Sequence, residues 1–154
     1  GGVLLSPGPG QGRTIEWAET NSILLLDLAK PPASLADSSM WMRPVKWNQG
    51  GYDAIFWSNN TVTFVQVTRG KTHSFKIEFF EQLLRAFTET VGLQIQHVDI
   101  YYVVPLSRVQ SFRISEVSGH GLLEPYRTSN GTKWGNTAEH RRVRIVGMQD
   151  LSES

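Results

Sequence analysis

One stretch of the chain, residues 51–106, changes its hydrophobic period and thereby restricts the fold more than any other part. Residues 52–57, which are apolar except for Asp53, and residues 61–68 are predicted to be strands, and turn residues lie between them. Residues 77–91 then repeat apolar side chains every three or four positions, which is typical of an amphipathic helix. Residues 98–104 form an almost continuous apolar run, typical of a strand covered on both faces. This order predicts an α/β domain.

The helix predicted after the second strand has a complete set of local signals. Glu81 and Arg85 have the four-residue spacing that favours an ion pair. Thr72 or Ser74 can cap its start, and Gly92 can end it. The predicted buried stripe consists of Ile77, Phe80, Leu83, Leu84, Phe87 and Val91.

Composition predicts one domain over residues 1–154, because 154 residues with 40% hydrophobic content can bury a core. Lysine and arginine total 15 against 14 acidic residues, so a nucleic-acid surface has to be a local patch. The chain has no cysteine, which excludes disulfides and thiolate metal sites and fits an intracellular protein. No apolar run reaches the roughly 18 residues of a membrane span, so no membrane partner is expected.

The other segments have weaker signals. In chain order we predict a flexible N-terminal segment (1–13), a helix (14–30), a loop with a short strand (33–50), a strand (112–117) and a last strand (around 143–148). Pro31-Pro32 is a hard stop for the helix. Asn130-Gly131 is a turn signal. Because the chain opens on Gly1-Gly2, we expect it to be part of a longer protein.

Asp53 and Gln66 are the side chains most suggestive of chemistry. Each lies on one of two strands predicted to pair, with a turn between them. An acid in an apolar strand is costly unless it is exposed, paired or bound to a cation. Mg²⁺ prefers oxygen ligands, and a bound Mg²⁺ acidifies water and stabilises charge on a phosphate. The pair therefore predicts a cation site.

These features resemble the restriction-endonuclease-like, or PD-(D/E)xK, nuclease superfamily. Asp53, the segment FVQVT at 64–68 and His73 before a helix look most like the nuclease domain of Crinkler effectors and trypanosomatid retrotransposon hot spot proteins. The resemblance spans about residues 12–106 and leaves 107–154 as a C-terminal extension. It implies an αβββαβ core, with a central mixed sheet flanked by helices. It also implies Mg²⁺- or Mn²⁺-dependent cleavage of DNA, within a larger effector-like protein in the nucleus.

The resemblance also assigns roles to residues. Asp53 matches the metal-binding aspartate, and Gln66 stands where the second ligand belongs and can bind through its carbonyl oxygen. Glu16 matches an acid on the preceding helix. Thr68 stands in place of the motif lysine, and Gly51-Tyr52 replaces the proline before the aspartate. The water-activating role then passes to Lys71 or Lys76. The predicted phosphate contacts are Arg69, Lys71, Lys76, Arg141 and Arg142.

Each of these residues also has a purely structural interpretation. Asp53 can be a strand-start residue bonded to a loop amide, and Gln66 with Thr68 can form a polar ladder. His73 can be a capping or packing residue, and Lys71 a solvated charge. On these grounds the alternative function is a catalytically inactive module on the same fold. Such a module would bind DNA, host proteins or other domains of a larger protein. A purely structural domain is the third interpretation.

Overall fold

The computed structural model describes the backbone of residues 2–7, 15–18, 23–26, 39–44, 53–135 and 138–153, and the side chains of 39–43, 53–135 and 138–153. The strands are β1 (Gly2–Pro7), β2 (Ile15–Ala18), β3 (Ile23–Leu26), β4 (Met40–Pro44), β5 (Ala54–Ser58), β6 (Thr61–Val67), β7 (Thr72–Lys76), β8 (His97–Pro105), β9 (Arg113–Ser118) and β10 (Arg144–Met148). Helix α1 (Ile77–Ala86) continues into a π-helical turn (Phe87–Val91), and 3₁₀ turns cover Leu106–Arg108 and Glu139–Arg142.

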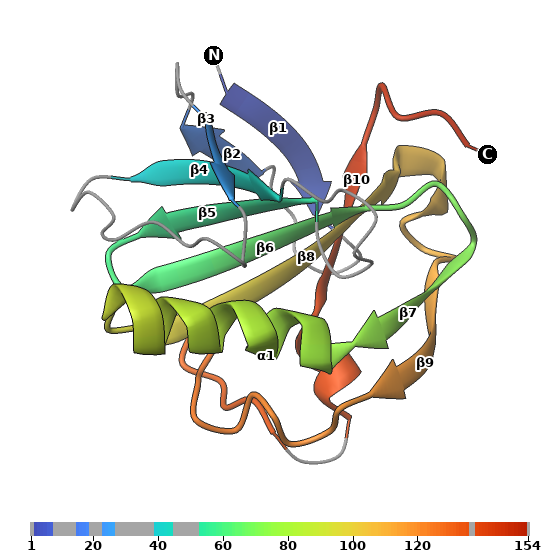
Figure 1. Cartoon of the computed structure of the whole chain (residues 1–154). Helices are drawn as coiled ribbons and strands as arrows, with labels where there is room; N and C mark the ends of the chain where they lie inside the picture. The colour runs from blue at the N-terminus through green and yellow to red at the C-terminus, as the bar shows by residue number, and fades with distance from the viewer. Residues whose placement is uncertain are drawn as a thin grey trace.

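A mixed sheet forms the centre of the molecule, and α1 lies across one face of it (Figure 1). The strand order is β2-β1-β10-β8-β6-β5-β4-β3. Strands β10, β8 and β6 are parallel to one another, whereas β5 is antiparallel to both β6 and β4. Strands β7 and β9 pair separately. The predicted α/β class and mixed sheet are confirmed.

The β5–β6 hairpin positions the candidate site. Asn59 and Asn60 have φ of 50° and 62°, the left-handed values that the tight turns of hairpins require. The strands pair antiparallel, as the predicted hairpin requires, with Ala54 opposite Val65. After the hairpin the chain passes through β7 and α1 and returns as β8 beside β6, so the predicted strand–helix–strand crossover is confirmed.

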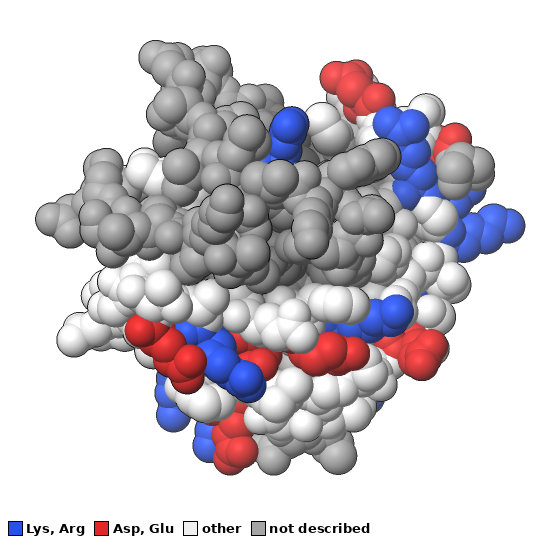
Figure 2. Space-filling view, viewed as in Figure 1, with Lys and Arg blue, Asp and Glu red and all other residues white. Residues whose placement is uncertain are grey.

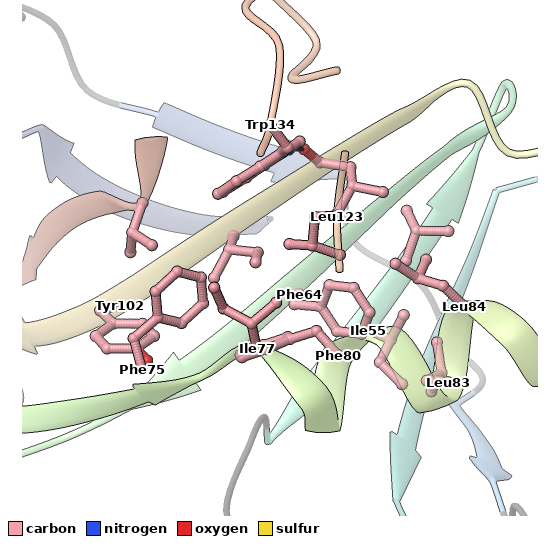
Figure 3. Packing of buried hydrophobic residues seen from close by; sticks show 14 of the residues in the cluster. Ile55, Phe64, Phe75, Ile77, Phe80, Leu83, Leu84, Tyr102, Leu123 and Trp134 are labelled. Carbon is pink, nitrogen blue, oxygen red and sulfur yellow. Dashed lines mark hydrogen bonds between the residues drawn. The ribbon is translucent and has the colours of Figure 1, made fainter. Parts of the chain in front are cut away.

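Helix α1 is anchored by its apolar stripe. Ile77, Phe80, Leu83, Leu84 and Phe87 are each 0% exposed, as predicted. They join the core formed by Ile55, Phe64 and Ile100 from the sheet, and the Phe64 and Phe80 rings meet edge to face at 4.9 Å (Figure 3).

The ends of this helical segment test the predicted caps. Gly92 ends it with φ of 79°, and Arg85 bonds Glu81 at 2.6 Å, so both predictions are confirmed. The predicted capping by Thr72 or Ser74 is wrong. Both residues lie in β7, which runs directly into α1, and Lys76 occupies the N-cap without a side-chain bond.

Two N-terminal predictions are also wrong. Residues 2–7 form β1 rather than a flexible segment, and the helix predicted over 14–30 is replaced by β2 and β3. A short apolar run such as Ile23–Leu26 fits a strand as well as a helix, and pairing with β4 decides for the strand.

Two predicted strands and one predicted turn near the C-terminus agree with the structure, whereas most of the loop predicted over 33–50 lies outside the described residues. The predicted strands over 112–117 and 143–148 appear as β9 and β10. The Asn130-Gly131 turn is present, with Gly131 at φ of 91°. Among the residues described, no helix combines the length and the apolar character that crossing a bilayer requires.

Candidate functional site

Asp53 and Gln66 meet at the end of the hairpin opposite the turn. The Asp53 backbone N–H donates to the Val65 carbonyl at 2.7 Å, beside the pair of Ala54 and Val65 that ends the β5–β6 register. The Gln66 side-chain Nε2 donates to Asp53 Oδ2 at 3.1 Å, and the Val67 backbone N–H donates to the same oxygen at 2.6 Å. The carboxyl group and the side-chain amide therefore share one face of the sheet.

The orientation of the Gln66 amide determines whether this side chain presents its nitrogen or its oxygen to Asp53. Its Nε2 also donates to the Val67 carbonyl oxygen at 3.1 Å. A reversed amide would set its own oxygen against that carbonyl and against the Asp53 carboxylate, and both contacts would be repulsive. The Gln66 oxygen therefore points away from the carboxylate. A cation shared by the two side chains requires a rotation of the amide.

The carboxyl group of Asp53 is half-buried, and burial is the largest influence on its titration. Burial raises the pKa of Asp53 above 3.8, while the Val67 N–H and the charge of His73 lower it in part. A carboxylate partly removed from water gains from nearby positive charge. Burial therefore favours the neutral, protonated form of this carboxyl group.

His73 and Tyr102 complete the surroundings of this pair. Tyr102 of β8 is in register with Gln66, and its ring meets the His73 ring edge to face at 5.5 Å. The Ser74 carbonyl accepts from the Tyr102 hydroxyl at 2.9 Å and lies 2.7 Å from His73 Nδ1. Because a carbonyl only accepts, Nδ1 carries a hydrogen, and in the neutral ring Nε2 keeps its lone pair. Burial raises the pKa of Tyr102 far above its usual value, so its hydroxyl stays neutral.

Glu16 is on a strand that does not adjoin β6, and its side chain is outside the described residues. It lies on β2, and β1, β10 and β8 stand between β2 and β6. Strand β2 is therefore not a neighbour of β6 within the sheet. The helix on which Glu16 was expected is also replaced by strand β2.

The basic residues predicted to contact phosphates all lie on the surface. They are Arg69, Lys71, Lys76, Arg141 and Arg142. The charge of Lys71 lowers the pKa of Glu153 in the C-terminal segment, and Lys76 Nζ lies 5.9 Å from the centre of the Phe79 ring. Thr68, at the motif-lysine position, is buried. Figure 2 shows acidic and basic side chains interspersed over the described part of one face, without a continuous basic patch.

A cation at Asp53 would have few protein ligands. Among the residues whose side chains are described, no group of three or more His, Cys, Asp or Glu could hold a metal ion. Mg²⁺ is commonly held by one or two carboxylates, with water and substrate phosphates completing its shell. Asp53, a rotated Gln66 amide and water fit that minimal type of site.

No known family model, curated protein or solved structure matches this chain. The functional assignment therefore depends on the geometry of the site.

The structure adds two residues that the sequence patterns did not place in a site. Tyr102 was predicted only as part of a buried strand. Its place near the site follows from the parallel register of β6 and β8, which sets it opposite Gln66. Arg108 was not considered, although its guanidinium is mostly buried after β8 and donates to the Arg69 carbonyl at 2.7 Å. A charged residue just beyond a buried strand was the available signal.

Proposed function

We propose that this chain is a metal-dependent nuclease domain of the restriction-endonuclease-like type, which hydrolyses phosphodiester bonds of DNA with Mg²⁺ or Mn²⁺. The observation that carries the proposal is the contact between the Asp53 carboxylate, just before β5, and the Gln66 amide on β6. The order β4, β5, β6, β7, α1, β8 also supports it, because it contains the hairpin, the helix and the following strand expected of such a core, with β7 inserted before the helix and strands β2 and β3 in place of the expected first helix. Action on DNA fits a nuclear location and a role within a larger protein.

In this proposal Asp53 is the main cation ligand, and Gln66 becomes the second when its amide turns its oxygen inward. When bound, the cation supplies an acidified water and neutralises charge on the phosphate. His73 lies close enough to influence Asp53, and in its neutral form its Nε2 would accept the proton of the attacking water. Lys71, whose charge acts on Glu153, contacts a phosphate together with Arg69 and Lys76.

The test is cleavage of supercoiled plasmid DNA with Mg²⁺, with Mn²⁺ and with EDTA. We expect nicking only with a divalent cation, and loss of nicking in Asp53→Asn. The matched control is Asp150→Asn, which removes the same charge from an exposed position after β10 and should cleave normally. A thermal melt of each variant shows that it is folded. Cleavage by folded Asp53→Asn at the native rate would contradict the proposal.

A second candidate function is a catalytically inactive module on the same fold, which binds DNA or another protein. Two observations favour it. The Gln66 amide donates a hydrogen bond to Asp53 instead of offering its oxygen, and a buried threonine, Thr68, stands where the motif has its lysine. Such a module would bind DNA at low salt, where phosphate contacts are strongest, and would not nick it with any cation. Binding without cleavage would favour this function over the nuclease.

A further inference from the structure

Arg108 forms the centre of a second polar cluster, which also includes Ser107, Lys71 and Glu153. The side chain of Arg108 is only 10% exposed, although arginine is rarely buried. Its Nη1 donates to the Arg69 carbonyl at 2.7 Å, so the guanidinium is fixed by the chain that follows β6. As a result, Arg108 Nη2 is held in position to donate a hydrogen bond to the Glu153 carboxylate.

The acceptor that Arg108 faces is a single carboxylate, bound through both of its oxygens. Arg108 Nη2 donates to Glu153 Oε2 at 3.2 Å, and the Ser107 hydroxyl donates to Glu153 Oε1. These two bonds lower the pKa of Glu153, and the charge of Lys71 lowers it further. A guanidinium and a hydroxyl that bind one carboxylate, with the positive charge of Lys71 acting on it, form a set of groups that also suits a phosphate.

Glu153 is the replaceable member of the cluster. Its side chain is 48% exposed, whereas its main partner Arg108 is 10% exposed. It lies beyond β10 in residues 151–153, which form no helix or strand. Ion pairs with an exposed partner contribute little to stability, so an external anion of higher charge can displace this carboxylate.

The cluster lies at the same end of the sheet as the Asp53–Gln66 pair. Strands β6 and β8 are parallel, with Val67 opposite Val103, and the Thr68 N–H donates to the Val103 carbonyl at 2.9 Å. Arg69 follows β6 and Arg108 follows β8, so both lie beyond the carboxyl ends of these strands. Gln66 occupies the same end of β6.

We infer that Ser107, Arg108 and Lys71 form a phosphate-binding site, in which the Glu153 carboxylate takes the place of the phosphate when no ligand is bound. The ligand class is a phosphate oxyanion, either free or within a DNA backbone. The assignment to DNA rests on the proposed function, whereas the anion site itself does not. The segment that carries Glu153 would then compete with substrate for the site.

The experiment compares Glu153→Gln with Asp150→Asn, which removes the same charge from an exposed residue without a part in the cluster. The probes are inorganic phosphate, by calorimetry, and a fluorescent DNA oligonucleotide in EDTA, by anisotropy. We expect Glu153→Gln to bind phosphate about two- to sixfold more tightly than the native protein does. This factor corresponds to the usual strength of an exposed ion pair, which the phosphate no longer has to displace in the variant. Ser107→Ala and Lys71→Gln, both at exposed positions, should weaken binding without unfolding the chain.

Each outcome bears on the inference. Equal phosphate affinity in Glu153→Gln and Asp150→Asn would overturn it, as would unchanged affinity in both Ser107→Ala and Lys71→Gln. Tighter phosphate binding without tighter DNA binding would support the anion site and reject its assignment to DNA. Because EDTA removes divalent cations, these results do not depend on cleavage, and a failure of the nuclease proposal would appear only in the plasmid assay.

Discussion

At the scale of single residues, the donor and acceptor roles of Gln66 decide what the site can do. Without a cation, its amide hydrogens satisfy Asp53 Oδ2 and the Val67 carbonyl. With a cation, the same side chain must offer its oxygen. Glutamine can either donate or offer an oxygen, because the oxygen and the NH₂ group of its amide are similar in size. An ionised glutamate can only accept. Replacement by glutamate therefore separates the two states.

We predict that Gln66→Glu destabilises the metal-free protein by about 1–3 kcal/mol, because two carboxylates then face each other and the Val67 carbonyl loses a donor. Mn²⁺ should restore the stability, since the variant offers it a second carboxylate. Melting temperatures with and without Mn²⁺ measure both effects. Gln66→Leu is the control, because it loses the donor without gaining a ligand, so Mn²⁺ should help it less. An equal response of both variants to Mn²⁺ would count against a cation site.

The titration of Asp53 gives a prediction about pH. Its pKa in the folded chain is raised above 3.8, so folding favours the protonated form. This contribution to stability is fully present below the pKa of the unfolded chain and is lost as the pH rises through the folded pKa. The variant Asp53→Asn has no ionisable group at this position and would show no such loss. Its melting temperature minus that of the native protein should therefore increase from about pH 3 to about pH 7. A decrease over that range would contradict the assigned direction.

At the scale of elements, α1 stabilises the sheet on the face that carries the site. Its buried stripe covers Ile55, Phe64 and Ile100, and its exposed side carries the Glu81–Arg85 pair. Burial of hydrocarbon and an exposed ion pair differ greatly in their contribution to stability, so substitutions on the two sides of the helix should differ as well.

We predict that Leu84→Ala, at a position that is 0% exposed, lowers the free energy of unfolding by about 2–5 kcal/mol, because a buried leucine leaves a cavity. Arg85→Ala on the exposed side should cost only about 0.3–0.5 kcal/mol. Urea denaturation of both variants measures the difference. Similar costs for the two would show that the helix does not pack as described.

The Leu106–Arg108 turn packs tightly against β10 at Gly147. A Cβ on Gly147 would lie 2.5 Å from Val109 Cγ2 and 3.0 Å from Leu106 Cα. We predict that Gly147→Ala costs about 1–3 kcal/mol, the usual cost of overpacking. Because the displaced turn carries Arg108, phosphate affinity should fall as well. Urea denaturation and phosphate calorimetry on the same variant test both effects, and an unchanged variant would contradict this packing.

At the scale of the whole molecule, the sequence predicts the central part of the fold and only part of the site. The hairpin, α1 and β8 could be predicted, because their periods differ clearly and Asn59, Asn60 and Gly92 mark their ends. The strands at Ile15–Ala18 and Ile23–Leu26 could not, because pairing with distant strands determines short apolar segments.

The site divides in the same way. The meeting of Asp53 and Gln66 follows from strand alternation, whereas the rotation of the Gln66 amide depends on the Val67 carbonyl beside it. The distance of Glu16 from the pair depends on the order of strands across the sheet. The Arg108 cluster joins segments some 45 residues apart, as its bond to Glu153 shows, so no local pattern indicates it.

The most direct measurement of the central claim is paramagnetic broadening of NMR signals by Mn²⁺, in the native chain and in Asp53→Asn. If the Asp53–Gln66 pair binds a divalent cation, substoichiometric Mn²⁺ will first broaden the backbone amide of Val67 and the side-chain signals of Gln66 and His73. The same signals will stay sharp in Asp53→Asn. Broadening that is absent from these residues, or equal in the two proteins, would contradict a cation site at Asp53.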